Sequence, residues 1–242
     1  MPRRPGSAHL LRGSVQGSVR GPVQGSLASA ALLLATVALL VVPSSLVAQD
    51  ARSILQAAAD RHQALSGFCA DFRQVVDNDI LRQVTRSRGE LCQAGSDLFE
   101  MRFTDPEGDR VVADGEHIWI YLPSADPGQV FQGVLNGSGG QFDLHRELLA
   151  EPGERYLPTL EGEEEVDGHR THVLALEPAG VSPFLRARVW VDVSNHMLRK
   201  LQITEDEGFV RTVELSALEV NPTIPPERFQ FEPPSGVQVI RR

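Results

Sequence analysis

Two cysteines, Cys69 and Cys92, are the residues whose type and spacing most directly predict a chemical bond. They are the only cysteines in the chain, and an even count in a chain exported to an oxidising compartment favours a disulfide. Both lie on the polar sides of alternating stretches, and a hairpin that turns at Ile80-Leu81 would set them opposite each other. We therefore predict a Cys69–Cys92 disulfide. The alternative is two free thiols offset by a bulge, because a slip of one residue would send the side chains to opposite faces.

Catalytic and metal-binding patterns are absent from the sequence, which has no G-x-S-x-G elbow, P-loop or G-x-G-x-x-G fingerprint. His169 and His172 are three residues apart on a predicted strand, so they point to opposite faces and cannot share a metal ion. His62 is expected at a helix surface or boundary. The run 163–165 of three glutamates is expected to be a solvated strand edge, with docking of a basic partner as the alternative. We therefore expect no enzymatic activity, no metal and no cofactor.

Apolar surface is what the sequence does supply. Apolar residues recur at every second position along the predicted strands, so they share one face of the sheet. A solid barrel core is one interpretation of this face. The other is a concave cavity for an apolar ligand, in which each buried methylene contributes ~0.8 kcal/mol. The residues predicted to line it are Phe68, Phe72, Leu91, Phe99, Met101, Phe103, Ile118, Ile120, Val189, Val191, Leu201, Ile203, Val213 and Leu215.

The strands that carry this face are predicted to form hairpins. In the central hairpin, 109–123, a two-residue turn at Asp114-Gly115 would place Val111 opposite Ile118. A second two-residue turn is predicted at Asp167-Gly168. Regularly spaced hairpins and few helices favour a mainly β fold with some α: one domain built as a half-open, curved antiparallel β-barrel.

Two helices are predicted around the sheet. The stripe of apolar residues over 51–65 has helical spacing. A Gly-rich hinge, 133–140, precedes a short amphipathic helix over 141–150, whose apolar residues are Phe142, Leu144, Leu148 and Leu149. A hinge that leads into an apolar helix favours a lid. A surface helix that caps one end of the sheet is the alternative.

The first 48 residues are predicted to be a signal peptide. Four arginines precede the apolar run 27–42, and Ala48 is the expected residue before the cut. A transmembrane anchor is the alternative, although a mostly apolar run of 16 residues falls short of the usual ~20. The remaining residues, 49–242, are expected to form one exported domain. They hold 19 basic and 32 acidic residues, a net charge of −13, which argues against nucleic acid as a partner.

Four motifs in the right order resemble the LolA family of periplasmic lipoprotein carriers. The opening strand 67–74, Gly-Phe-Cys-Ala-Asp-Phe-Arg-Gln, is similar to the "F.A.F.Q" strand of the family. The central hairpin is similar to its "DG…W.Y" pair, and 189–192 to the strand after its lid. The tail from Asn221 to Val237 resembles its closing motif. The similarity covers 54–239.

This resemblance implies a carrier that holds lipoprotein acyl chains without chemistry. It implies acylated lipoproteins as cargo, an inner-membrane lipoprotein-releasing ABC transporter as donor and an outer-membrane receptor as acceptor, with the carrier a monomer. Where the family has a basic residue that ties down the lid, this chain has Gly95, and the family's aromatic at the position of Cys92 is missing, so control of the lid must differ. The alternatives are a sensor of mislocalised lipoproteins in an envelope stress pathway, a carrier of another acylated lipid, and a lipid-modifying enzyme.

Overall fold

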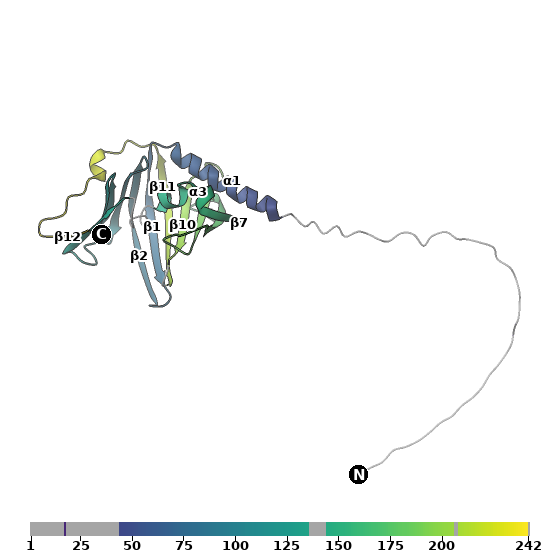
Figure 1. Ribbon diagram of the computed structural model, residues 1–242, viewed down its shortest axis with the longest axis horizontal. Helices are drawn as coiled ribbons and strands as arrows, with labels where there is room; N and C mark the ends of the chain where they lie inside the picture. Colours follow the sequence, from purple (N-terminus) through teal and green to yellow (C-terminus); the bar gives the residue numbers. More distant parts are fainter. Residues whose placement is uncertain (1–16, 18–43, 136–143, 206–207, 242) are drawn as a thin grey trace, which may run out of the picture. The chain divides into compact units, whose positions relative to one another are not determined.

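The alternating stretches form one curved sheet of twelve strands, seen in a computed structural model that describes residues 17, 44–135, 144–205 and 208–241 (Figure 1). The first half holds α1 (Ser44–Gln63), β1 (Gly67–Asn78), β2 (Gln83–Ala94), β3 (Leu98–Asp105), β4 (Glu107–Asp114), β5 (His117–Tyr121) and β6 (Gln129–Val134). The second half holds α2 (Leu144–Leu149), α3 (Pro152–Arg155), β7 (Tyr156–Val166), β8 (His169–Pro178), β9 (Arg186–Asp192), β10 (Leu198–Thr204), β11 (Phe209–Val220), the 3-10 helix η3 (Pro226–Phe229) and β12 (Gln238–Arg241).

The sheet is open, with two edges. Its strand order is β12-β6-β5-β4-β3-β2-β1-β11-β10-β9-β8-β7, so β12 and β7 are the edge strands. The first strand, β1, lies in the middle, between β2 and β11. All neighbours are antiparallel except β12, which pairs with β6 in parallel. The predicted mainly β fold with a half-open, curved sheet is confirmed, and the parallel β12 was not predicted.

The β1–β2 hairpin has the predicted register along its whole length. Asn78 pairs with Gln83, and Cys69 pairs with Cys92. At the tip, the side-chain oxygen Oδ1 of Asn78 accepts a hydrogen bond of 2.8 Å from the N–H of Leu81. The turn at Asp167-Gly168 is also as predicted: both residues have positive φ, 50° and 77°, as a two-residue hairpin turn requires.

The register of the central hairpin is not the predicted one. Val111 pairs with Ile120 and not with Ile118. The reason is the side chain of Asp114, whose Oδ1 accepts the N–H groups of Glu116 (2.9 Å) and His117 (2.7 Å). Asp114 therefore ends β4, and the turn moves to Gly115-Glu116. Because the pairing shifts by two residues, each side chain keeps its predicted face.

The N-terminal helix is longer than predicted at its start. α1 begins at Ser44 and not at residue 51, since no Gly or Pro interrupts the sequence from Ser44 onward. It therefore includes Ala48, the predicted residue before the cleavage site. The apolar run 27–42 lies outside the described residues, so the signal peptide and the boundary at residue 48 stay predictions. Ala51, Leu55 and Ala58 of α1 are buried, and the helix packs mainly on β7 (Figure 1).

A C-terminal strap, defined here as residues 221–237, was not predicted as an ordered element. It leads from the end of β11 through η3 to β12. Its Phe229 is buried, and the ring of Phe231 lies near the rings of Trp119 and Tyr121 on β5. The strap therefore covers the face of β3–β5 that lies opposite the predicted apolar face.

Candidate functional site

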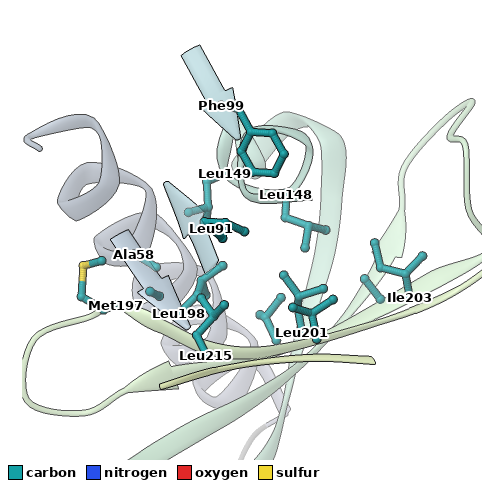
Figure 2. Close-up of a cluster of buried hydrophobic side chains, with 14 of the residues drawn as sticks. Ala58, Leu91, Phe99, Leu148, Leu149, Met197, Leu198, Leu201, Ile203 and Leu215 are labelled. Atoms are coloured by element: carbon teal, nitrogen blue, oxygen red, sulfur yellow. The ribbon is translucent and has the colours of Figure 1, made fainter. Parts of the chain in front are cut away.

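The face of the sheet that carries the predicted apolar residues is the inner face, the one that meets α1 and α2. Thirteen of the fourteen predicted residues are buried in one apolar cluster, and Ile120 is partly buried against it. Figure 2 shows Leu91, Phe99, Leu201, Ile203 and Leu215 pointing into this cluster from several strands. The sheet therefore brings these residues together in one packed apolar cluster. That this cluster binds lipid stays a prediction.

Helix α2 completes the cluster from the other side. Its Leu148 and Leu149 are buried and belong to the same cluster, into which both point (Figure 2). The predicted helix 141–150 is described only as Leu144–Leu149. Phe142 and residues 136–140 of the predicted hinge lie outside the described residues, as does the side chain of Leu144. Gly133, the first predicted hinge residue, belongs to β6, where it pairs with Ile118.

Two residues that follow α2 form hydrogen bonds with its last turn. Arg155 donates a hydrogen bond of 2.9 Å to the main-chain oxygen of Glu147 and forms an ion pair with its carboxylate. The hydroxyl of Tyr156 donates to the same main-chain oxygen, at 3.0 Å. Burial, and next the nearby charge of Glu147, raise the pKa of Tyr156, so this hydroxyl stays protonated and can donate. These contacts were not predicted, because their partners have no periodic spacing.

In the part of the chain that the structure describes, no hydrogen bond joins Gly95 to α2. Gly95 lies in the turn after β2 with a φ of 59°, and its N–H donates to the main-chain oxygen of Ser66 at 3.0 Å. The expectation that control of the lid differs from the family pattern stays a prediction.

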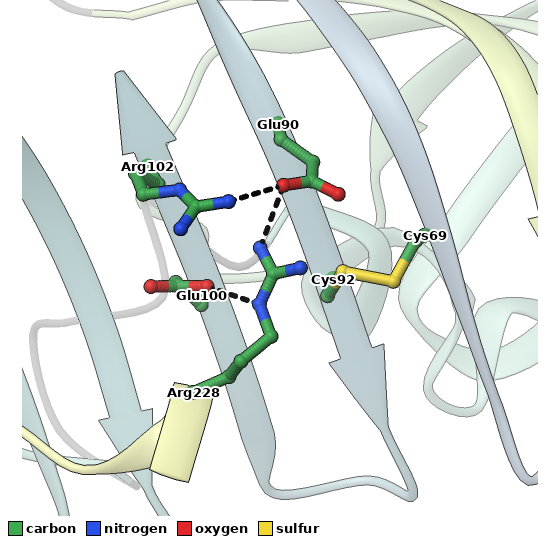
Figure 3. Close-up of a disulfide and its surroundings, with 6 residues drawn as sticks. All are labelled: Cys69, Glu90, Cys92, Glu100, Arg102 and Arg228. Carbon is green, nitrogen blue, oxygen red and sulfur yellow. Dashed lines mark hydrogen bonds and ion pairs between the residues drawn. A yellow bond between two sulfur atoms is a disulfide. The ribbon is translucent and has the colours of Figure 1, made fainter. Parts of the chain in front are cut away.

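The outer face of β1 and β2 contains the predicted disulfide. Cys69 and Cys92 are bonded, with their Cα atoms 4.1 Å apart. Glu90 lies beside the two sulfurs, as Figure 3 shows. Because the sulfurs are bonded to each other, neither is a thiolate that could bind a metal ion.

Charged residues of the outer face are joined to the strap through Arg228 (Figure 3). Its guanidinium donates to Glu100 at 2.6 Å and to Glu90 at 3.0 Å. Glu90 also accepts from Arg102 at 2.6 Å, and Glu100 from Arg110 at 2.8 Å. The hydrogen bond from Arg228 lowers the pKa of Glu90; burial opposes this shift, and Arg102 adds to it. Directional hydrogen bonds therefore hold the strap against the outer face of the sheet.

The other candidate residues have structural contacts. His169 lies 3.1 Å from Asp192, while His172 lies 3.4 Å from Glu163, so the two histidines meet different carboxylates. Within the run 163–165, Glu164 accepts a hydrogen bond from the indole of Trp190 at 2.8 Å. These contacts favour the interpretation of the glutamate run as a strand edge. Among the helices of the described residues, none combines the length and apolar character needed to cross a membrane.

Comparison with known proteins agrees with this architecture. A family model described as "Outer membrane lipoprotein carrier protein LolA" matches residues 63–133, which run from the end of α1 into β6. The outer-membrane lipoprotein carrier protein of Legionella pneumophila (strain Corby) is 28% identical over 205 residues, covering 84% of this chain and 96% of the relative. That of Chromobacterium violaceum is 29% identical over 171 residues, covering 71% and 79%.

Among solved structures, an uncharacterized conserved protein from Thermus thermophilus has a similar fold, with a TM-score of 0.51 at 14% identity. The match covers 80% of this chain and 100% of that one. This match shows the fold alone; the family model and the sequence relatives are what confirm the resemblance that the four sequence motifs carry.

Proposed function

We propose, from the premise that the chain is a LolA-like protein, that it is a periplasmic carrier of lipoproteins. In this proposal the carrier takes acylated lipoproteins from a lipoprotein-releasing ABC transporter of the inner membrane and passes them to an outer-membrane receptor. It acts as a monomer by reversible burial of acyl chains and without a chemical step. The family resemblance supports the carrier role, and the shuttle between membranes is the finer part of the proposal.

The observation that carries the proposal is the inner apolar cluster and its closure by α2. Twelve strands form one continuous sheet, and a helix of six residues covers part of its apolar face with two buried leucines. An acyl chain that replaced Leu148 and Leu149 would meet the same apolar neighbours, at ~0.8 kcal/mol for each methylene buried. A few methylenes would then offset the loss of the two leucine contacts.

The experiment compares two neighbouring residues of β5 that face opposite sides of the sheet. Ile120 lies on the inner face and Tyr121 on the outer face, and both are partly buried. We expect Ile120→Asn to weaken binding of a fluorescent fatty-acid probe roughly tenfold, because a polar group would lie unpaired in an apolar site. Tyr121→Asn is the matched control and should leave the probe affinity unchanged. Equal effects of the two variants, or no binding by the wild type, would contradict an inner-face site.

The cargo and the direction of transport need a cellular test. Depletion of the protein should remove lipoproteins from the outer membrane and leave them at the inner membrane, measured by fractionation. Normal sorting with an altered envelope stress response would instead favour the sensor. Mass spectrometry of the lipid that co-purifies from the periplasm would identify a different acylated cargo.

A further inference from the structure

Gln93 is a polar residue at an inner-face position of β2, two residues beyond Leu91. Side chains alternate along a strand, so Gln93 faces the same side of the sheet as Leu91. Its register partners are Phe68 on β1 and Phe99 on β3, and both belong to the inner apolar cluster. Gln93 is only 1% exposed. A complete amide group is therefore buried between two aromatic members of the cluster.

The two ends of this amide differ in their partners. Nε2 of Gln93 donates a hydrogen bond of 3.3 Å to the main-chain oxygen of Gly95. A carbonyl oxygen can only accept, so the NH2 group faces Gly95 and Oε1 points away from it. Among the residues that the structure describes, none donates a hydrogen bond to this buried Oε1. Because buried side-chain oxygens are nearly always paired, Oε1 marks a place for a donor from outside the described residues.

Gln93 lies where the inner face meets the rim of the sheet. β2 ends at Ala94, and the residues 95–97 that follow are exposed. On the other side of Gln93 the apolar cluster continues with Leu91. A lipid with its acyl chain on the cluster and its head group at the rim would bring the linkage between them to Gln93. Such a linkage is an ester or an amide, and only a secondary amide has an N–H.

We propose that Oε1 of Gln93 accepts the N–H of an amide-linked acyl chain and makes the carrier selective for the amide over the ester. This inference rests on the proposed function and adds a specificity-determining residue to it. An amide N–H that is buried without an acceptor is unfavourable, so a wholly apolar face would favour the ester. Gln93 supplies the acceptor. The linking oxygen of an ester cannot donate, so with an ester Oε1 stays unpaired.

The experiment compares two ligands that differ in one group, N-butyl lauramide and butyl laurate. Each is used to displace a fluorescent fatty-acid probe from the protein, and the ratio of the two affinities is measured. We expect the wild type to favour the amide and Gln93→Leu to favour the ester. The ratio should change about tenfold, as for one buried hydrogen bond. Gln93→Met, which keeps the length of the side chain and removes the acceptor, should have the same effect.

Gln74→Leu is the matched control. Gln74 lies on β1, on the same face as Phe68 and roughly 20 Å along the strand from it. Both ends of its amide are paired: Nε2 donates to Ser87 at 3.2 Å, and Oε1 accepts from Arg211 at 3.4 Å. Removing this amide removes no free acceptor, so Gln74→Leu should keep the amide-to-ester ratio of the wild type.

The outcomes separate this inference from the carrier function. Binding of both ligands with the same ratio in the wild type and in the Gln93 variants would overturn the role of Gln93 and leave the carrier supported. An equal change of the ratio in Gln74→Leu would also overturn it. Failure of the wild type to bind the probe or either ligand would overturn both proposals. A preference for the amide that is lost in the Gln93 variants and kept in Gln74→Leu would support both.

Discussion

On the inner face of β1 and β2, Phe72 and Leu91 lie in an apolar cluster, whereas on the outer face of the same strands Cys69 and Cys92 are joined covalently. The two inner-face side chains are held by burial alone, since neither carries a polar group. The outer face is held by the disulfide and by the hydrogen bonds of Arg228. One pair of strands therefore combines two kinds of stabilisation.

The difference shows which face of the sheet could exchange one set of packing partners for another. Burial of apolar surface is non-directional, so an acyl chain can replace a leucine without a loss of geometry. A disulfide and charged hydrogen bonds need fixed atoms. The outer face thus keeps the curved sheet in shape through fixed contacts, whereas the apolar contacts of the inner face need no fixed partner atoms.

The largest expected effect comes from the inner face. Phe72 is 1% exposed and packs edge-on against Phe103, with the ring centroids 5.1 Å apart. Phe72→Ala should lower the free energy of unfolding by about 3–5 kcal/mol, through lost burial and the cavity left behind. Urea denaturation measures the change. Val84→Ala, at a residue that is 44% exposed, should cost much less, and equal losses would show that the inner face is not the main source of stability.

A smaller effect is expected from the disulfide on the outer face. The double variant Cys69→Ala/Cys92→Ala opens a loop whose ends are 23 residues apart and should lower stability by about 3 kcal/mol in the chain-entropy model. Its probe affinity, measured at a temperature where it is folded, should equal that of the wild type. A loss of binding as large as the loss of stability would mean that the two faces are not separate in function.

The smallest effect concerns the charges of the outer face and their dependence on pH. The pKa of Glu90 is lower in the folded protein, chiefly through the hydrogen bond from Arg228. A lowered folded-state pKa stabilises the protein above the unfolded-state pKa, and this contribution is lost as the pH falls through the folded-state value. Glu90→Gln should therefore lose less stability than the wild type between about pH 5 and pH 3. Parallel denaturation curves across this range would show that Glu90 contributes nothing.

The alternation of polar and apolar residues was enough to predict which face each strand residue takes. It placed Phe68, Phe72 and Leu91 inside and Cys69 and Cys92 outside, as the structure has them. Face assignment survives a register shift of two residues, because side chains alternate between the faces with a period of two; the central hairpin shifted by two residues and kept every face. The register itself depended on a side chain, that of Asp114, which no periodicity reveals.

The parts that were not predicted are those without a repeat. The strap is rich in proline, and its position depends on single contacts such as those of Arg228 with Glu90 and Glu100. The hydrogen bonds from Arg155 and Tyr156 to the main-chain oxygen of Glu147 likewise depend on tertiary geometry. Contacts of this kind join residues by direction and distance, and the sequence pattern contains neither.

The central place of β1 in the sheet also fixes when the protein can fold. During synthesis β1 is the first strand to appear, yet one of its two neighbours, β11, is among the last. Similarly, β6 can pair with β12 only after the C-terminus has been made. A nascent chain that still lacks β11 and β12 therefore has open edges at both strands, exposed to pairing with other chains. Such distant pairing makes folding slow and essentially post-translational. A chaperone that shields β1 and β6 until the C-terminus arrives would raise the yield of folded protein.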